Sequence, residues 1–212
     1  MEEILNKLLK NNIIEYIELN TNEIKVMERK EQGRGEITLK FYNNCKFIKI
    51  NPEEFNKNLQ NLFISGGDCV EEPNLSKICD GIIIYTENDV CNLILVELKK
   101  TINNDNYIKV KQQLEATYVK IMMVLNIIYD ITKINLFCII AHDTKNKTEK
   151  KMFVNKMQNI PKNNGEYGEF LENKKIILKE IPFFFEIPIN EPFIKKNIEI
   201  HNIKFNECFK IL

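Results

Sequence analysis

Residues 79–99 read CDGIIIYTENDVCNLILVELK, two apolar runs separated by the polar dipeptide Asn88-Asp89. Apolar runs of this length beside turn residues are typical of β-strands, and a two-residue Asn-Asp turn suits the positive φ values of a type I′ hairpin. We therefore predict an antiparallel hairpin with strands at about 78–86 and 91–99. Both of its faces are apolar, which is typical of strands in the middle of a covered sheet.

Three charged residues stand at the open end of this hairpin. The turn pairs residue i with residue 177 − i, so Asp80 lies opposite Glu97, with Cβ atoms ~5 Å apart. Because side chains alternate along a strand, Lys99 lies on the same face as Glu97. Two facing carboxylates repel each other unless a cation lies between them, and Mg²⁺ prefers such oxygen ligands. Lys99 would then stabilise charge on an attacking water or on the transition state. The alternative is a structural salt bridge from Lys99 to Glu97 or Asp80.

The segments around the hairpin predict a helix–strand–strand–helix–strand order. Asn51, Pro52 and Glu54 have the spacing of an N-cap, a first helical residue and a capping box, which opens a helix at residue 52. Apolar spacing predicts the other elements: a helix at 107–130, a strand at 134–142, a lysine-rich helix at 144–158, a helical segment at 2–19, a hairpin at 24–50 with turns at 33–35 and 43–44, and strands from 174 onward. We expect an α/β fold in one domain over residues 1–212, a mixed central β-sheet flanked by helices, with extra N- and C-terminal β elements.

Asp80 on one strand and Glu97-Leu98-Lys99 on the next resemble the motif of the PD-(D/E)XK nuclease superfamily, an Asp followed by Glu-x-Lys. The resemblance covers about residues 52–142. It implies a restriction-endonuclease-like core and metal-dependent hydrolysis of phosphodiester bonds. It also implies catalytic roles for Asp80, Glu97 and Lys99. The implied cofactor is Mg²⁺, with Mn²⁺ as a substitute, bound by Asp80, Glu97 and the backbone carbonyl of Leu98.

The helix at 107–130 contains two adjacent glutamines, and many members of this superfamily place a catalytic glutamine there. When the apolar residues of this helix form its buried stripe, Gln113 lies on the flank of the stripe and Gln112 nearly opposite, toward solvent. We therefore assign the catalytic role to Gln113. The recombinase-type signature Gln-x-x-x-Tyr would need tyrosine at position 117, where this chain has Thr117.

Two further assignments stay open. Some superfamily members take a third acid from the helix before the first strand, and Glu53 and Glu54 are candidates by order. Glu54 is already explained as a helix cap, so this position is left unassigned. His142 ends a strand and could approach the site, but a strand-end histidine is more often a polar terminus.

The net charge is zero, but it is unevenly distributed along the chain. Residues 99–162 carry 12 basic and 5 acidic side chains, a net charge of +7, whereas residues 1–98 carry 11 and 17, a net charge of −6. A basic region favours an anionic partner, and the alternative is a set of solvated helix faces. We expect these lysines to contact nucleic acid, DNA more than RNA: Lys100, Lys109, Lys145, Lys147 and Lys151.

The composition disfavours several other classes. No run approaches the ~20 apolar residues of a membrane span. The acidic start of the chain does not resemble a secretory signal, so we expect a cytoplasmic protein. Six cysteines without a Cys-x-x-Cys pair, and only two histidines, disfavour a zinc site. The sequence contains no Gly-rich phosphate-binding loop that would indicate another class of enzyme.

The leading hypothesis is a DNA endonuclease in a restriction or defence setting, and the setting rests on the resemblance alone. The alternative is a non-catalytic module with a restriction-endonuclease-like fold that binds nucleic acid or protein. No separate DNA-reading domain is evident. Specificity would therefore come from loops, from a homodimer or from a partner protein.

Overall fold

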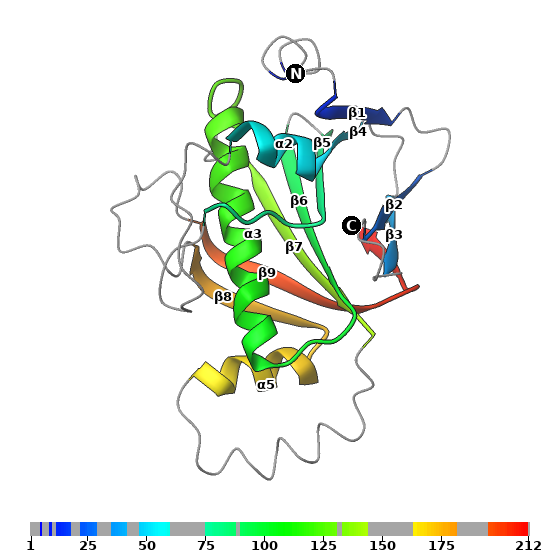
Figure 1. The fold of residues 1–212 in the computed structure, drawn as a ribbon, viewed down its shortest axis with the longest axis vertical. Helices are drawn as coiled ribbons and strands as arrows, with labels where there is room; N and C mark the ends of the chain where they lie inside the picture. Colours follow the sequence, from blue (N-terminus) through cyan, green and yellow to red (C-terminus); the bar gives the residue numbers. More distant parts are fainter. Residues whose placement is uncertain are drawn as a thin grey trace.

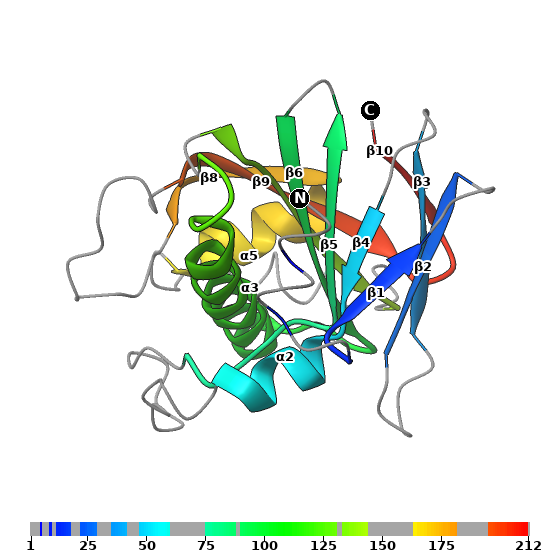
Figure 2. The same ribbon diagram turned by 90° about the horizontal axis from the view of Figure 1, so that it is seen from above.

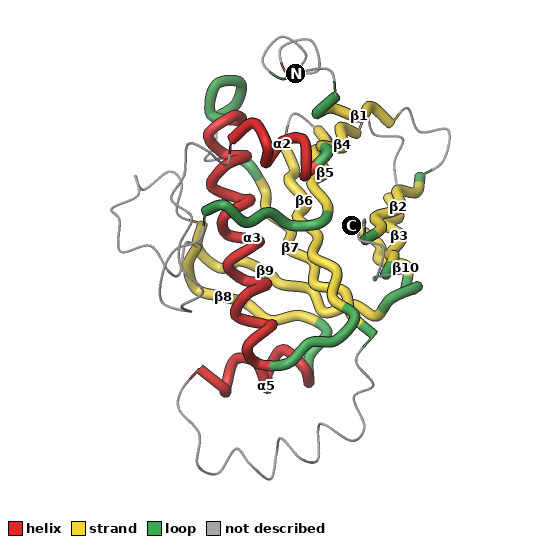
Figure 3. The backbone as a smooth tube through the Cα atoms, viewed as in Figure 1, coloured by secondary structure: helices red, strands yellow, loops and turns green. Residues whose placement is uncertain are grey.

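The computed structural model describes residues 5, 9, 12–17, 22–28, 35–41, 47–59, 75–87, 90–130, 133–143, 163–181 and 195–211. Within them the chain forms a mixed α/β fold with two β-sheets and three helices (Figures 1 and 3). The expected fold class is therefore confirmed. The predicted turn at 88–89 and the lysine-rich helix at 144–158 lie outside the described residues. No helix in the described part of the chain is long and apolar enough to cross a membrane.

The larger sheet has seven strands (Figure 1). In order across the sheet they are β1 (Ile14–Ile17), β4 (Phe47–Ile50), β5 (Gly81–Glu87), β6 (Val90–Lys99), β7 (Asn135–His142), β9 (Lys195–Lys204) and β8 (Lys175–Ile181). Strands β6, β7 and β9 run parallel to one another, and the other neighbours are antiparallel. The carboxyl ends of β6, β7 and β9 consequently meet at one edge of the sheet.

The hairpin β5–β6 has the predicted register. Gly81 pairs with Val96 and Glu87 with Val90, as residue i with residue 177 − i. Alternate residues of both strands are buried in two different hydrophobic clusters, one on each face of the sheet. The hairpin is therefore covered on both sides, as its apolar composition indicated.

Helices cover one face of the large sheet, and a smaller sheet covers the other (Figure 2). The helices are α2 (Pro52–Leu59), α3 (Asn104–Leu125) and α5 (Asn163–Glu172). The small sheet has the order β10 (Cys208–Ile211), β3 (Glu36–Phe41) and β2 (Glu23–Met27). The buried residues of the small sheet pack against Ile83 and Tyr85 of β5 in one hydrophobic cluster. The hairpin therefore lies between the helices and the small sheet.

Position 81 decides how closely the two sheets approach. A Cβ atom at Gly81 would lie 2.7 Å from Val26 Cγ1 on β2 and 3.2 Å from Val96 Cβ on β6. Since real Cβ atoms essentially never come as close as the 2.7 Å contact with Val26, β2 packs against the start of β5 only because residue 81 has no side chain.

Two predictions for the N-terminal part are wrong. The helical spacing at 2–19 is interrupted, because residues 14–17 form strand β1 and pair with β4. The segment 24–50 is not one continuous hairpin: β2 pairs with β3, but β4 leaves them and pairs with β5 in the large sheet. Short apolar runs do not specify which sheet a strand joins. Helix α5 was not predicted, and the strands after residue 174 were.

Helix α2 begins at Pro52 as predicted, with the Asn51 side chain accepting the Glu54 N–H at 3.3 Å. The second half of the predicted capping box is wrong. The Asn51 N–H donates to the Ile13 carbonyl at 2.8 Å, because the segment leading into β1 lies beside it. The Glu54 carboxylate instead accepts hydrogen bonds from Asn12 and Lys57.

Candidate active site

A cavity of about 140 Å³ lies at the carboxyl end of β6, where β2, α2, α3 and the start of β5 come together. Pro52, Ile78 and Cys79 line part of it. The other lining residues carry three carboxylates, one ammonium and one amide: Glu28, Glu53, Asp80, Lys99 and Gln113. Asp80, Lys99 and Gln113 are residues that the sequence predicted to share one site. Glu28 and Glu53 join them from elements that precede the hairpin by more than twenty residues.

Glu97 lies behind the cavity and is fully buried. Its Oε1 is 2.5 Å from Lys99 Nζ, and the Lys99 side chain is 30% exposed. Neither carboxyl oxygen of Glu97 has a well-aligned hydrogen bond within the described part of the chain. Burial raises the pKa of Glu97 to about 8, the charge of Asp80 adds to the rise, and Lys99 opposes it. A buried carboxylate whose oxygens lack hydrogen bonds can accept a further cation as a ligand.

Asp80 is the residue just before β5, one position beyond the last pair of the β5–β6 ladder. Its Oδ2 accepts the backbone N–H of Leu98 at 2.9 Å. This hydrogen bond, which the sequence did not predict, holds the carboxylate against the backbone between Glu97 and Lys99. Asp80 is close enough to Glu97 to raise the pKa of that carboxyl group.

Lys99 remains a cation in this setting. Burial lowers the pKa of Lys99, but the carboxylates of Glu97, Asp80 and Glu28 outweigh burial, and the pKa is raised above its ordinary value. The same ion pair realises the alternative interpretation of the sequence, a salt bridge between Lys99 and Glu97. Lys99 also lines the cavity, so its ammonium is available to a molecule bound there.

Helix α3 fixes the backbone that leads into Asp80. Lys120 Nζ donates to the Lys77 carbonyl at 2.6 Å, and Gln113 Nε2 donates to the Ile78 carbonyl at 3.2 Å. The Thr117 hydroxyl accepts the Cys79 N–H at 2.8 Å. Three consecutive residues before Asp80 are thus anchored by positions 113, 117 and 120, which lie on one side of a helix. Gln113 is both an anchor and a lining residue.

The predicted orientation of Gln112 is wrong. Gln112 is only 8% exposed, and its neighbours Lys111 and Glu115 are also buried. The helix is covered on more than its apolar stripe, because Lys111 pairs with Glu166 of α5 at 2.8 Å. Since α5 was not predicted, the spacing of apolar residues placed that side of α3 in solvent.

The remaining predicted residues lie apart from the cavity or outside the described residues. Lys100 and Lys109 are exposed. The Leu98 N–H donates to Asp80, and its side chain is in the core on the face of the small sheet. His142 is buried and hydrogen-bonded to Asn202 at 2.8 Å, as a structural residue would be. Lys145, Lys147 and Lys151 are not among the described residues.

Of the two additional acids, the sequence indicated Glu53 but not Glu28. Glu53 was a candidate by its order in the chain, and its place at the start of α2 is what directs it into the cavity. Glu28 carried no signal, because it follows a strand of the other sheet and reaches the cavity only through the packing of β2.

The donor set suits a divalent cation that prefers oxygen. Mg²⁺ in enzymes is usually bound by one or two carboxylates together with water and substrate phosphate. Asp80, Glu28 and Glu53 line the cavity, and the buried carboxyl group of Glu97 lies next to Lys99 at its wall, so Asp80 and Glu97 could supply two such ligands. Among the described residues, no three His, Cys, Asp or Glu side chains are close enough to enclose a metal ion by themselves.

Fold and cavity together define a mixed α/β protein with an acidic, lysine-containing cavity at the carboxyl end of a central parallel strand. Comparisons of the chain with protein-family models, with curated proteins and with solved structures found no match.

Proposed function

We propose that this protein is a metal-dependent nuclease of the PD-(D/E)XK type that hydrolyses phosphodiester bonds, with DNA as its substrate. The observation that carries the proposal is the fully buried Glu97, paired with Lys99 beside Asp80, at the end of an otherwise apolar hairpin. Charged groups are costly at such a position, and a purely structural ion pair does not require the second acid.

Four side chains at the cavity have a role in this proposal. Asp80 and Glu97 would bind Mg²⁺, with the backbone carbonyl of Leu98 as a further ligand. The ion, when bound, would polarise the phosphoryl group and lower the pKa of a bound water. Lys99 would stabilise the negative charge that develops as the water oxygen attacks phosphorus and the bond to the leaving oxygen breaks. Gln113 would orient the water or a phosphate oxygen.

The test is the conversion of supercoiled plasmid to nicked or linear forms in the presence of Mg²⁺. We expect wild-type protein to cleave and Lys99→Ala to be slower by a factor of ~10²–10³, the usual cost of losing one stabiliser of transition-state charge. Lys133→Ala, which removes the same charge from an exposed lysine outside the cavity, is the matched control and should cleave like wild type. DNA binding by Lys99→Ala should persist, because one lysine contributes little to it.

The second candidate is a binding module without turnover, which the Glu97–Lys99 ion pair also accommodates. This candidate predicts that Lys99→Ala unfolds at a markedly lower temperature, since it leaves a buried carboxylate unpaired. Early melting of Lys99→Ala, together with absence of metal-dependent cleavage of duplex DNA, single-stranded DNA and RNA by wild type, would make the nuclease proposal wrong.

A further inference from the structure

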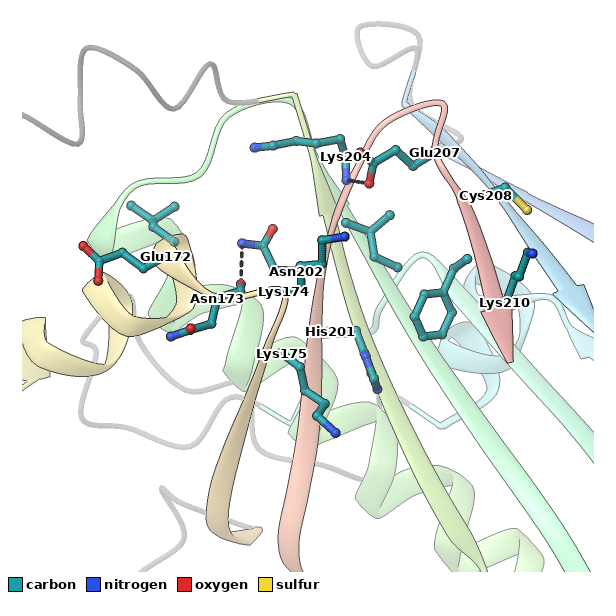
Figure 4. A pocket seen from close by; sticks show the side chains of 13 residues that line it. Glu172, Asn173, Lys174, Lys175, His201, Asn202, Lys204, Glu207, Cys208 and Lys210 are labelled. Atoms are coloured by element: carbon teal, nitrogen blue, oxygen red, sulfur yellow. Dashed lines mark hydrogen bonds between the residues drawn. The ribbon is translucent and has the colours of Figure 1, made fainter. Parts of the chain in front are cut away.

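A second cavity, of about 560 Å³, lies beside the end of α5, the start of β8, the end of β9 and β10 (Figure 4). It does not share any residue with the carboxylate-lined cavity. Its charged lining residues are four lysines and two glutamates, a net charge of +2 with His201 neutral: Lys174, Lys175, Lys204, Lys210, Glu172 and Glu207. In contrast to the first cavity, this one is basic.

Part of this charge is already compensated. Lys175 Nζ lies 2.8 Å from Glu199 Oε1, and Lys204 Nζ lies 3.2 Å from His142 Nδ1. Lys174 and Lys210 are exposed, and neither forms an ion pair with another residue in the described part of the chain. They come from different parts of the chain: Lys174 directly precedes β8, and Lys210 lies in β10 (Figure 4). Lysines gathered around a concave surface repel one another unless an anion binds between them.

The position of the basic cavity relates it to the carboxylate-lined one. Lys99 of β6 pairs in register with His142 of β7, and His142 pairs with Lys204 of β9. Strands lie ~4.8 Å apart, so the Cα atoms of Lys99 and Lys204 are separated by ~10 Å. Lys99 lines the first cavity and Lys204 the second. Both cavities therefore lie at the edge where the parallel strands end.

We propose that the basic cavity binds phosphate groups of the DNA strand whose phosphodiester bond is cut in the carboxylate-lined cavity, an inference that rests on the proposed nuclease function. Successive phosphates of one strand are ~3.4 Å apart along the duplex axis, so ~10 Å corresponds to about three nucleotides. Lysine suits this role, because its flexible ammonium contacts a phosphate as a point charge. Lys174 and Lys210 are the principal contacts, and Lys204 is the lining residue that is aligned with Lys99 through His142.

The experiment measures binding of the full-length protein to a short fluorescein-labelled DNA duplex in EDTA, over a range of salt concentrations. The double variant Lys174→Gln/Lys210→Gln should bind about tenfold more weakly, and its log–log salt slope should be smaller by about 2, as expected for two lost phosphate contacts. Lys25→Gln/Lys133→Gln removes the same charge from exposed lysines outside both cavities and should change the affinity less than about twofold. Lys174→Arg/Lys210→Arg should bind like wild type.

Equal weakening in the two glutamine variants would overturn the inference, because only total charge would then matter. Inorganic phosphate that binds with the same dependence on Lys174 and Lys210, while the duplex does not, would also overturn it in favour of a small phosphate ligand. Plasmid cleavage with Mg²⁺ is measured separately. If the Lys174→Gln/Lys210→Gln variant loses duplex affinity but wild type does not cleave plasmid, the basic cavity binds DNA and the nuclease proposal is wrong. If wild type cleaves plasmid but the variant binds the duplex with unchanged affinity, the nuclease proposal stands and the basic cavity does not bind DNA.

Discussion

Glu97 and Lys99 stand two residues apart on the same strand, yet only Lys99 reaches the cavity wall. Burial of the Glu97 carboxylate costs free energy, which its ion pair with Lys99 only partly offsets. Asp80, held by the Leu98 N–H, adds a repelling charge at the same place. At the scale of single residues, a bound cation would therefore reduce the repulsion between Asp80 and Glu97 and the cost of burying the Glu97 carboxylate.

The two neighbouring glutamates of α2 allow a matched test of the third acid. Glu53 lines the cavity, whereas Glu54 binds Lys57 and Asn12 on the outside. We expect Glu53→Gln to weaken Mg²⁺ binding and to lower the cleavage rate about tenfold at limiting Mg²⁺, because it removes an oxygen charge that faces the ion. Glu54→Gln should leave both unchanged. Mg²⁺ titrations of cleavage that coincide for the two variants would exclude Glu53 from the site.

His142 should make stability depend on pH in the acidic range. Burial lowers the pKa of His142 to about 4, with Lys204 adding to the effect, whereas an unfolded chain has a histidine pKa near 6.5. The stability that the neutral imidazole contributes is thus present above about pH 6.5 and is lost as the pH falls toward 4. Urea unfolding at about pH 7 and about pH 5 should show a smaller loss in His142→Gln than in wild type. Equal losses would mean that His142 does not titrate in this way.

At the scale of secondary structure, α3 connects the chemistry to the fold. Its residues 113, 117 and 120 anchor the three backbone groups before Asp80. Lys120 also donates to Asn56 of α2 at 2.6 Å, so α3 fixes the helix that carries Glu53 as well. Acids from two different elements are consequently positioned by one helix.

Gly81 should be the least tolerant glycine near the site. In Gly81→Ala the new methyl group would overlap Val26 of β2, and overpacking of this kind costs about 1–3 kcal/mol of stability. The double variant Val26→Ala/Gly81→Ala removes the overlap, so its loss of unfolding free energy should be smaller than the sum of the two single losses. Chemical denaturation of the four proteins measures this coupling, and strictly additive losses would show that the two sheets do not meet at residue 81.

At the scale of the whole molecule, the small sheet joins distant parts of the chain. Strand β10, near the end of the chain, pairs in parallel with β3, and β3 pairs with β2. This sheet covers the face of the hairpin opposite α3 and brings Glu28 to the cavity. The C-terminal strand thereby supports a site that is formed by residues far from it in the sequence.

Ile211 tests this long-range support. It is 4% exposed and belongs to the cluster between the two sheets, so Ile211→Ala should cost about 2–4 kcal/mol of unfolding free energy. Hydrogen exchange should show the amides of β2 and β3 losing protection before those of β5 and β6. Cys208→Ser changes an exposed position of the same strand and should be close to neutral. Uniform loss of protection across both sheets would indicate that the small sheet does not open separately.

The amino-acid sequence alone determined the β5–β6 register, the burial of both faces of that hairpin and the meeting of Asp80, Glu97 and Lys99 at its open end. These features depend on a two-residue turn and on alternation along a strand, which are local rules. The resemblance implied a glutamine in the helix after the hairpin, and the apolar stripe of that helix, another local pattern, selected Gln113. None of these predictions required knowledge of which segments pair at a distance.

Only the tertiary structure decided the rest: the division of 24–50 between two sheets, the burial of Gln112, the arrival of Glu28 at the cavity and the gathering of lysines around β8, β9 and β10. The physical reason is common to all four. Which sheet edge a short strand joins, and which surface a helix covers, depends on packing and hydrogen bonding between segments far apart in the chain, and an apolar run offers the same pattern to several partners.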